Sequence, residues 1–222
     1  MFLFYITDRK QLAGTPEGQR TLLLARIRAA AMAGIDAIQL REKDLTAREL
    51  VELGCGAAEI IRETNSSGIS PCVTKLLINS RVDIAIACGA DGVHLRSDDI
   101  SAAEARSVFV QAGVAQPVIA VSCHTVNEVE LAEGSGAEFA VFGPVFEKSG
   151  TAARAAGISE LRRACQQRRA AKPQMPVLAL SGVDLDNAAQ CMRAGASGIA
   201  AIRLFQSADV AETVSSLRKL RI

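Results

Sequence analysis

The residues Ala33-Gly34-Ile35-Asp36-Ala37-Ile38 carry the end of one helical segment, a tight turn and the start of one strand. Glycine adopts the left-handed conformation at a helix end at little cost, which explains its place in this phrase. Related phrases are Cys88–Val93, Ser135–Ala140 and Ala194–Ile199. This repetition predicts a chain built from successive β/α units.

Short apolar runs rich in branched residues alternate with longer segments of helical period, which is typical of a parallel sheet with crossover helices. The expected strands are Phe2–Thr7, Ala37–Leu40, Lys75–Ile78, Gly92–Leu95, Val118–Ser122, Phe139–Gly143, Val177–Leu180 and Gly198–Ile202. The expected helices are Gly18–Ala33, Thr46–Thr64, Val82–Cys88, Ala102–Gln111, Val126–Gly134, Ile158–Ala170, Leu185–Ala194 and Val210–Leu220.

Residues typical of helix ends accompany these segments. Thr46, Ser101 and Asp184 stand where helix N-caps are expected, and Ser101 has Glu104 at the spacing of a capping box. The glycines expected to end helices are Gly34, Gly89, Gly134 and Gly195.

Eight near-equal β/α units favour a closed barrel over a doubly wound sheet, although right-handed crossovers are compatible with both. The chain has 222 residues, a length at which one barrel commonly forms one domain. We therefore expect an α/β fold, a single (β/α)₈ TIM barrel, with residues 1–222 as one domain.

Composition narrows the classes of function. The formal net charge is +1 and the charged residues are interspersed, so neither nucleic acid nor a membrane surface is an expected partner. We find neither a basic leader segment nor an apolar run of membrane-spanning length, and we expect a soluble, cytoplasmic protein. The six cysteines form no C-x-x-C pair and only two histidines accompany them, which argues against structural zinc. A homo-oligomer stays open.

Polar residues follow most of the expected strands, at the end of the barrel where such folds carry their active sites. Gln39, Arg41 and Lys43 alternate across the end of the second strand and would therefore point the same way. The other strand ends carry Asn79-Ser80-Arg81, Asp98-Asp99, Ser122-Cys123-His124-Thr125, Gly143-Pro144, Lys148-Ser149-Gly150-Thr151 and Ser181-Gly182. Cations, hydroxyls and glycine amides around one opening suit a phosphate or pyrophosphate.

Each of these groups also has a structural interpretation. The alternating run at 39–43 also fits a solvated strand end. Asp99 fits the start of a helix as well as it fits a ligand of a Mg²⁺ ion that would lie between its carboxylate and the phosphate. His94 lies within an apolar strand, which favours a core histidine. His124 directly follows a strand beside Ser122, which favours a role in a site.

Taken in order, the motifs resemble the family of thiamine-phosphate synthase and its relative TenI, a thiazole tautomerase. They are Tyr5-Ile6-Thr7-Asp8, Gln39-Leu40-Arg41-Glu42-Lys43, Leu77-Ile78-Asn79 with Arg81, Gly89–Leu95, Val121-Ser122 with His124-Thr125, Gly143–Phe146, Gly157-Ile158 and Gly195-Ala196. The resemblance runs almost from end to end. It implies a transferase of thiamine biosynthesis that joins a hydroxymethylpyrimidine diphosphate to a thiazole phosphate, giving thiamine phosphate and pyrophosphate.

The resemblance also implies roles for residues of this chain. Arg41, Lys43 and Asn79 would hold the pyrophosphate, Gln39 would bind the pyrimidine, and Asp99 would bind Mg²⁺. The residues implied in catalysis are Arg41, Lys43, Ser122 and His124. Those implied in binding the two substrates are Gln39, Arg41, Lys43, Asn79, Ser122, Lys148, Thr151, Ser181, Gly182, Ile202 and Arg203.

The chain departs from the family pattern at several of these places. Ser80 stands where the family usually has an aspartate that binds the metal, so one metal ligand is missing. Lys148 is displaced in its loop, Ser181 replaces a glycine, and Arg203 replaces a small hydroxyl residue. Two alternatives therefore stay open: a TenI-like tautomerase that uses His124 as acid and base, and a non-catalytic protein that binds thiamine precursors.

Overall fold

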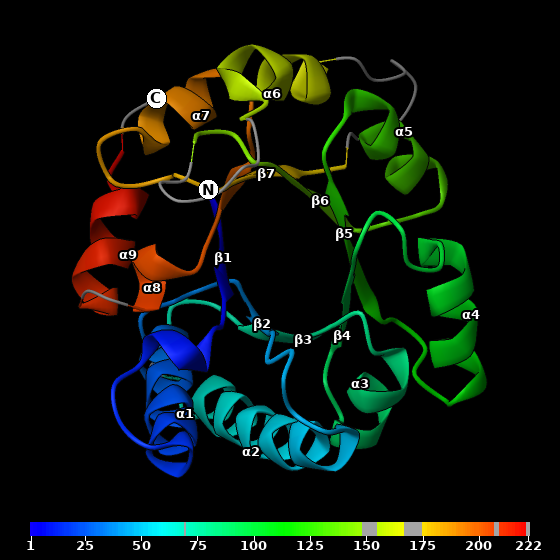
Figure 1. Ribbon diagram of the computed structural model, residues 1–222, viewed down its shortest axis with the longest axis vertical. Coiled ribbons are helices and arrows are strands. Elements are labelled where there is room, and N and C mark those ends of the chain that lie inside the picture. The colour runs from blue at the N-terminus through cyan, green and yellow to red at the C-terminus, as the bar shows by residue number, and fades with distance from the viewer. Residues whose placement is uncertain (69, 148–154, 167–174, 207–208, 221–222) are drawn as a thin grey trace.

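The strands of the computed structural model close into a barrel, with the helices arranged around it (Figure 1). The structure describes residues 1–68, 70–147, 155–166, 175–206 and 209–220. Each strand pairs in parallel with the next one in sequence, and β8 pairs with β1 through Phe2↔Gly198 and the following residues. The predicted closed (β/α)₈ barrel is thus confirmed, and the alternative of a doubly wound sheet is excluded.

The strands lie where the sequence predicted them, and no end differs by more than one residue. They are β1 Phe2–Ile6, β2 Ala37–Leu40, β3 Lys75–Asn79, β4 Gly92–Leu95, β5 Val118–Cys123, β6 Phe139–Phe142, β7 Val177–Leu180 and β8 Gly198–Ala201. The helices are η1 Arg9–Gln11, α1 Pro16–Met32, α2 Ala47–Ser66, α3 Val82–Cys88, α4 Ala102–Gln111, α5 Val126–Gly134, α6 Gly157–Gln166, α7 Ala188–Arg193, α8 Arg203–Gln206 and α9 Val210–Arg218. None of the helices in these ranges is both long and apolar enough to span a bilayer.

Reciprocal capping boxes fix the starts of two outer helices, α2 and α4. The Thr46 hydroxyl accepts the Glu49 N–H at 3.3 Å, and the Glu49 carboxylate accepts the Thr46 N–H at 2.9 Å. Ser101 and Glu104 make the same reciprocal pair at the start of α4. Both predicted caps are confirmed, and each stabilises its helix by about 1 kcal/mol.

The predicted start of α7 is wrong. We expected Asp184 to cap a helix beginning at Leu185, but α7 begins at Ala188. The Asp184 Oδ1 atom accepts the N–H groups of Asp186 and Asn187 at 3.0 Å each, which holds this segment in a turn before the helix.

One predicted helix stop is also wrong. Gly134 is the last residue of α5, and the left-handed residue that ends the turn is Gly136, with φ 82°. Gly34, Gly89 and Gly195 do have positive φ, as predicted. The short elements η1 and α8 were not predicted, and residues 167–170 of the expected sixth helix lie outside the described ranges.

The interior of the barrel is divided along its axis. Phe4 and Phe139 are buried and meet edge to face with ring centroids 5.3 Å apart, and Phe2 lies against Phe139. Polar side chains occupy the inner face nearer the carboxyl ends of the strands: Gln39, Asn79, His94 and Ser122. The fold therefore places an apolar plug below and a polar layer at the mouth, where barrel enzymes carry their sites.

Candidate active site

A buried network ties the ends of β1 and β2 together beneath the mouth. The Thr7 hydroxyl donates to Glu42 Oε1 at 2.6 Å and accepts the Arg41 N–H at 3.0 Å. Arg9 donates its N–H and its Nη1 to Glu42 Oε2, both at 3.1 Å. Burial raises the pKa of Glu42, and these donors oppose that shift. The network fixes the backbone between the predicted site residues Arg41 and Lys43.

Arg41 and Lys43 form a cationic group at the mouth together with Arg96, which follows β4. The charge of Arg41, partial burial and the charge of Arg96 lower the pKa of Lys43, in that order of importance. A lysine pKa falls beside like charges because a further positive charge there is unfavourable. An anionic ligand at this place would relieve that repulsion.

Asp99 lies in the turn after β4, and its side chain is mostly buried. Its Oδ2 accepts the Arg96 N–H at 2.8 Å, and its Oδ1 lies 3.3 Å from Arg96 Nε. Partial burial raises the pKa of Asp99, but the bonds from Arg96 and from the Ser80 hydroxyl outweigh it and lower the pKa below its usual value. Asp99 is therefore a carboxylate at neutral pH.

Ser80 has a positive φ of 59°, which is uncommon for a residue other than glycine. Its N–H donates to the His94 carbonyl at 2.9 Å, so the pairing of β3 and β4 holds this conformation. The Ser80 side chain thereby meets Asp99, the other residue predicted to bind a metal. Strained residues of this kind cluster at functional sites.

Gln39 and Asn79 are neighbours on the inner face. Gln39 Nε2 donates to Asn79 Oδ1 at 2.8 Å, and Asn79 Nδ2 donates to the Ser80 hydroxyl at 3.2 Å. Gln39 is buried, and its Oε1 has no hydrogen-bond partner among the described residues. A buried acceptor at a mouth is suited to a donor from a ligand.

His94 is buried inside the barrel, as predicted, yet it also contacts a predicted site residue. Its Nε2 lies 3.0 Å from the Ser122 hydroxyl, and its ring contacts Phe4. Burial, with a smaller contribution from the charge of Arg41, lowers the pKa of His94 to about 3. The imidazole is therefore neutral at physiological pH and holds the Ser122 hydroxyl through a hydrogen bond.

His124 is exposed at the end of β5, two residues beyond Ser122. Its Nδ1 lies 2.6 Å from the carbonyl oxygen of Gly143, and its backbone N–H donates to Glu128. The ring is thus held against the end of β6 through one nitrogen.

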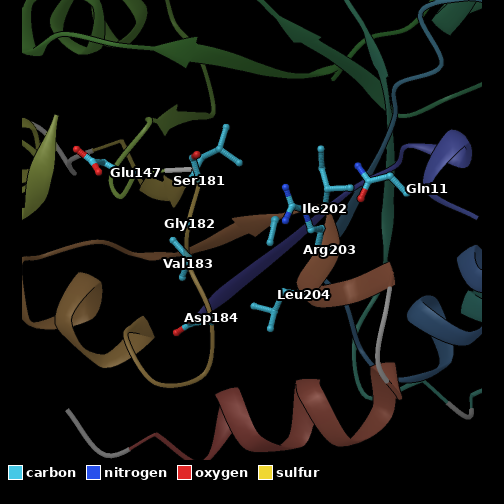
Figure 2. Close-up of a pocket in the computed structure, with 11 residues that line it drawn as sticks. Gln11, Glu147, Ser181, Gly182, Val183, Asp184, Ile202, Arg203 and Leu204 are labelled. Carbon is cyan, nitrogen blue, oxygen red and sulfur yellow. The ribbon is translucent and has the colours of Figure 1, made fainter. Parts of the chain in front are cut away.

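A pocket of about 520 Å³ opens on the other side of the mouth, between the ends of β7 and β8 (Figure 2). Figure 2 shows Ser181, Gly182 and Asp184 across the pocket from Arg203. Its lining residues are Gln11, Glu147, Leu180, Ser181, Gly182, Val183, Asp184, Ala201, Ile202, Arg203 and Leu204. Ser181 has a positive φ of 79°. Its described lining combines Arg203 and the backbone of Ser181 and Gly182, which can bind a phosphate, with two carboxylates, Glu147 and Asp184.

The structure brings most of the predicted site residues into two groups, and His124 lies apart from both lists, against the Gly143 carbonyl at the end of β6. One group lies on the β2–β5 side and contains Gln39, Arg41, Lys43, Asn79, Ser80, Asp99 and Ser122. The other lines the pocket at β7 and β8 and contains Ser181, Gly182, Ile202 and Arg203. Lys148 and Thr151 lie outside the described residues.

Sequence reasoning missed Arg96, Gln11, Glu147 and Asp184 as residues of the mouth. Arg96 had a signal, because Gly92, His94 and Arg96 continue one alternation on and beyond β4. Gln11 had none, since it reaches the pocket from the short helix η1. Glu147 and Asp184 lie in loops, where the spacing of residues along the sequence does not predict which way their side chains point.

A barrel with a cationic rim and a pocket suited to phosphate at the carboxyl ends of its strands belongs to the class of enzymes that act on small phosphorylated molecules. The family model described as thiamine monophosphate synthase matches residues 3–205. The chain belongs to this family, and it is accordingly a transferase of thiamine biosynthesis.

Individual relatives agree with this membership. A thiamine-phosphate synthase of Moorella thermoacetica is 35% identical over 219 residues, covering 97% of this chain and 94% of the relative. A thiamine-phosphate synthase of Chloroflexus aurantiacus is 33% identical over 221 residues, covering 99% and 90%. The solved thiamine phosphate pyrophosphorylase from Pyrococcus furiosus superposes with a TM-score of 0.77 at 29% identity, covering 98% of this chain and 94% of that one.

Proposed function

We propose that the two sides of the mouth bind the two substrates of thiamine-phosphate synthesis, the pyrimidine diphosphate at β2–β5 and the thiazole phosphate at β7–β8. The observation that carries this assignment is the presence of cationic side chains on both sides of one opening, Arg41 with Lys43 on one side and Arg203 in the pocket on the other. Each substrate brings one anionic group, and the reacting atoms would meet between these regions. The tautomerase and the non-catalytic binding protein are not favoured, because the relatives are named synthases.

The diphosphate would be held by Arg41, Lys43 and Asn79, with the Ser122 hydroxyl close by. The bond between the pyrimidine methylene carbon and the diphosphate oxygen breaks, and its electron pair leaves with the diphosphate. The thiazole nitrogen then forms the new bond to that carbon. Charge accumulates on the departing group, so fixed cations that stabilise it accelerate the step. The bonds of Thr7 to the Arg41 N–H and to Glu42 support this assignment, because they fix the backbone that carries Arg41 and Lys43.

Gln39 would recognise the pyrimidine ring. Its Oε1 is a buried acceptor with no partner among the described residues, while its amide nitrogen is engaged by Asn79. An exocyclic amino group on the ring would supply the missing donor. This arrangement links recognition of the ring to the residue that would hold the diphosphate.

The thiazole phosphate would occupy the pocket at β7 and β8. The Gly182 amide and the Ser181 hydroxyl would bind phosphate oxygens on one side, and Arg203 would bind them on the other. Ile202 would contact the thiazole ring. Lys148 and Thr151 stay predicted substrate contacts from the loop after β6.

Magnesium would be held by Asp99 and by the substrate diphosphate, with the Ser80 hydroxyl beside it. Among the described residues no three His, Cys, Asp or Glu side chains gather as a metal site. That is compatible with Mg²⁺, which is commonly bound by one or two carboxylates and substrate phosphates. When bound, it would neutralise charge on the diphosphate. His124, at the end of β5, stays a predicted catalytic residue.

The direct test supplies the pyrimidine diphosphate, the thiazole phosphate and Mg²⁺ to the purified chain and measures thiamine phosphate and pyrophosphate. We expect both products in equal amounts. Absence of product from folded protein would reject the synthase, and conversion of a thiazole carboxylate phosphate without Mg²⁺ would instead favour the tautomerase.

Lys43→Ala tests the placement of the diphosphate. Loss of one charged contact should weaken pyrophosphate binding about 10-fold or more. Lys219→Ala is the matched control, because Lys219 is exposed at the end of α9, on the outside of the barrel. Equal pyrophosphate affinity in the two variants would contradict the placement.

A further inference from the structure

Arg96 occupies a place at the mouth for which the family resemblance implied no role. His94 points into the barrel, where it meets Ser122 and Phe4. Side chains two residues apart on an extended segment point the same way, so Arg96 continues this inner face at the rim. The Arg96 side chain is 55% exposed, and a ligand at the mouth can reach it.

The turn after β4 holds the Arg96 guanidinium. Its Nε lies 3.1 Å from Asp98 Oδ1 and 3.3 Å from Asp99 Oδ1, and its Nη2 donates to Asp98 Oδ2 at 3.1 Å. The guanidinium has five N–H donors in a planar fork, so these contacts leave donors for a second anion. The side chain is thereby oriented before a ligand binds.

The balance of charge at the mouth favours an anion there. Arg41, Lys43 and Arg96 are close enough for the two arginines to lower the pKa of Lys43. On the same side, Asp99 meets the neutral hydroxyl of Ser80, at the position where a second carboxylate would attract a divalent cation. Three cationic side chains therefore lie beside the proposed diphosphate, and Ser80 supplies no carboxylate where the family pattern has one.

We propose that the Arg96 guanidinium binds the substrate diphosphate directly and supplies part of the positive charge that Mg²⁺ would otherwise bring. This inference rests on the proposed function, because it places the diphosphate on the β2–β4 side of the mouth. Asp98 and Asp99 orient the guanidinium, and its remaining donors bind phosphate oxygens.

The test is calorimetric titration of the whole chain with inorganic pyrophosphate, once with EDTA and once with Mg²⁺. The wild-type chain should bind pyrophosphate in EDTA. Arg96→Gln should bind about 10- to 100-fold more weakly in EDTA, as expected for the loss of a charged hydrogen bond, and the deficit should shrink several-fold in Mg²⁺. Arg96→Lys, which keeps the charge but loses the fork, should fall between the two.

Arg28→Gln is the matched control, because Arg28 also forms an exposed ion pair, with Glu63, but on the outside of the barrel. It should leave pyrophosphate affinity unchanged. Circular dichroism and the urea midpoint establish that each variant is folded. A role limited to ordering the turn would not make the loss depend on Mg²⁺, so the comparison between EDTA and Mg²⁺ separates the two roles.

If Arg96→Gln binds pyrophosphate in EDTA as tightly as the wild type, the inference is overturned. If the loss of affinity is the same with and without Mg²⁺, Arg96 does not supply charge that Mg²⁺ would otherwise bring. If Arg96→Gln also forms thiamine phosphate like the wild type at every Mg²⁺ concentration, the inference fails while the proposed function stands. A wild-type chain that neither binds pyrophosphate nor forms product would reject both.

Discussion

Thr7→Val should lower the free energy of unfolding of the barrel and should also release the Arg41 backbone at its mouth. The Thr7 side chain is fully buried, and its hydroxyl makes two hydrogen bonds, to the Glu42 carboxylate at 2.6 Å and from the Arg41 N–H at 3.0 Å. Valine keeps the shape but removes both bonds. An unsatisfied buried N–H costs about 1–3 kcal/mol, and a bond to a charged group contributes about 1.5–3 kcal/mol. Because such values are not additive, we expect a loss of about 2–4 kcal/mol.

Urea unfolding followed by circular dichroism measures this loss, with Thr7→Ser as the matched control that keeps the hydroxyl. The slope of the transition should not change, since the surface exposed on unfolding is nearly the same. Pyrophosphate affinity should fall in Thr7→Val as well, because the Arg41 backbone loses its anchor. If the valine variant is as stable as the serine variant, the network does not hold the end of β2.

Three further outcomes are expected. His94 has a pKa lowered from 6.5 to about 3 in the folded state, so the stability from its neutral form is lost as pH falls below 6.5, by about 2 kcal/mol between pH 7 and 5. In urea titrations His94→Gln should lose this part of the pH dependence and His124→Gln should retain it; identical slopes would contradict the assignment. A Cβ on Gly92 would lie 1.8 Å from a backbone oxygen of β5, so Gly92→Ala should cost more than about 3 kcal/mol or prevent folding, whereas Gly134→Ala, with open space around it, should be tolerated. Ser80→Asp should bind Mg²⁺ more tightly and raise the rate, because a second carboxylate is added at a positive φ that aspartate tolerates well; an unchanged Mg²⁺ midpoint for product formation would place Ser80 away from the metal.

The strands could be predicted closely because their signal is local. Each is a short apolar run bounded by glycine or polar residues, and the repeated phrase at Ala33–Ile38 marks where several begin. A side-chain cap marks a helix start only approximately: Ser101 caps α4 at its predicted start, but α1, which Thr15 caps, begins two residues before the predicted Gly18. Asp184 misled because the same side chain can cap a turn, and the sequence does not distinguish the two uses.

The site residues could be predicted where the alternation of residues along a strand determines which way their side chains point. Gln39 and Arg41 follow from this rule, and Arg96 would have followed had the rule been extended beyond β4. Contacts between segments far apart in the chain carry no such signal. The link between Thr7 and Glu42 and the approach of Gln11 to the pocket depend on how the barrel closes. The roles assigned to individual site residues stay predictions.

The buried pair of Phe4 and Phe139 below the polar layer leaves the carboxyl end of the barrel as the side from which ligands would reach that layer. Phe4 and Phe139 pack together beneath His94, so among the described residues apolar side chains occupy the axis below the polar layer. Under the proposed function, both substrates would enter and both products would leave through the rim above this layer. Under that arrangement a product held at the rim would delay the entry of the next substrates. The rate of turnover would then depend on the exchange of substrates and products at the rim as well as on the chemical step.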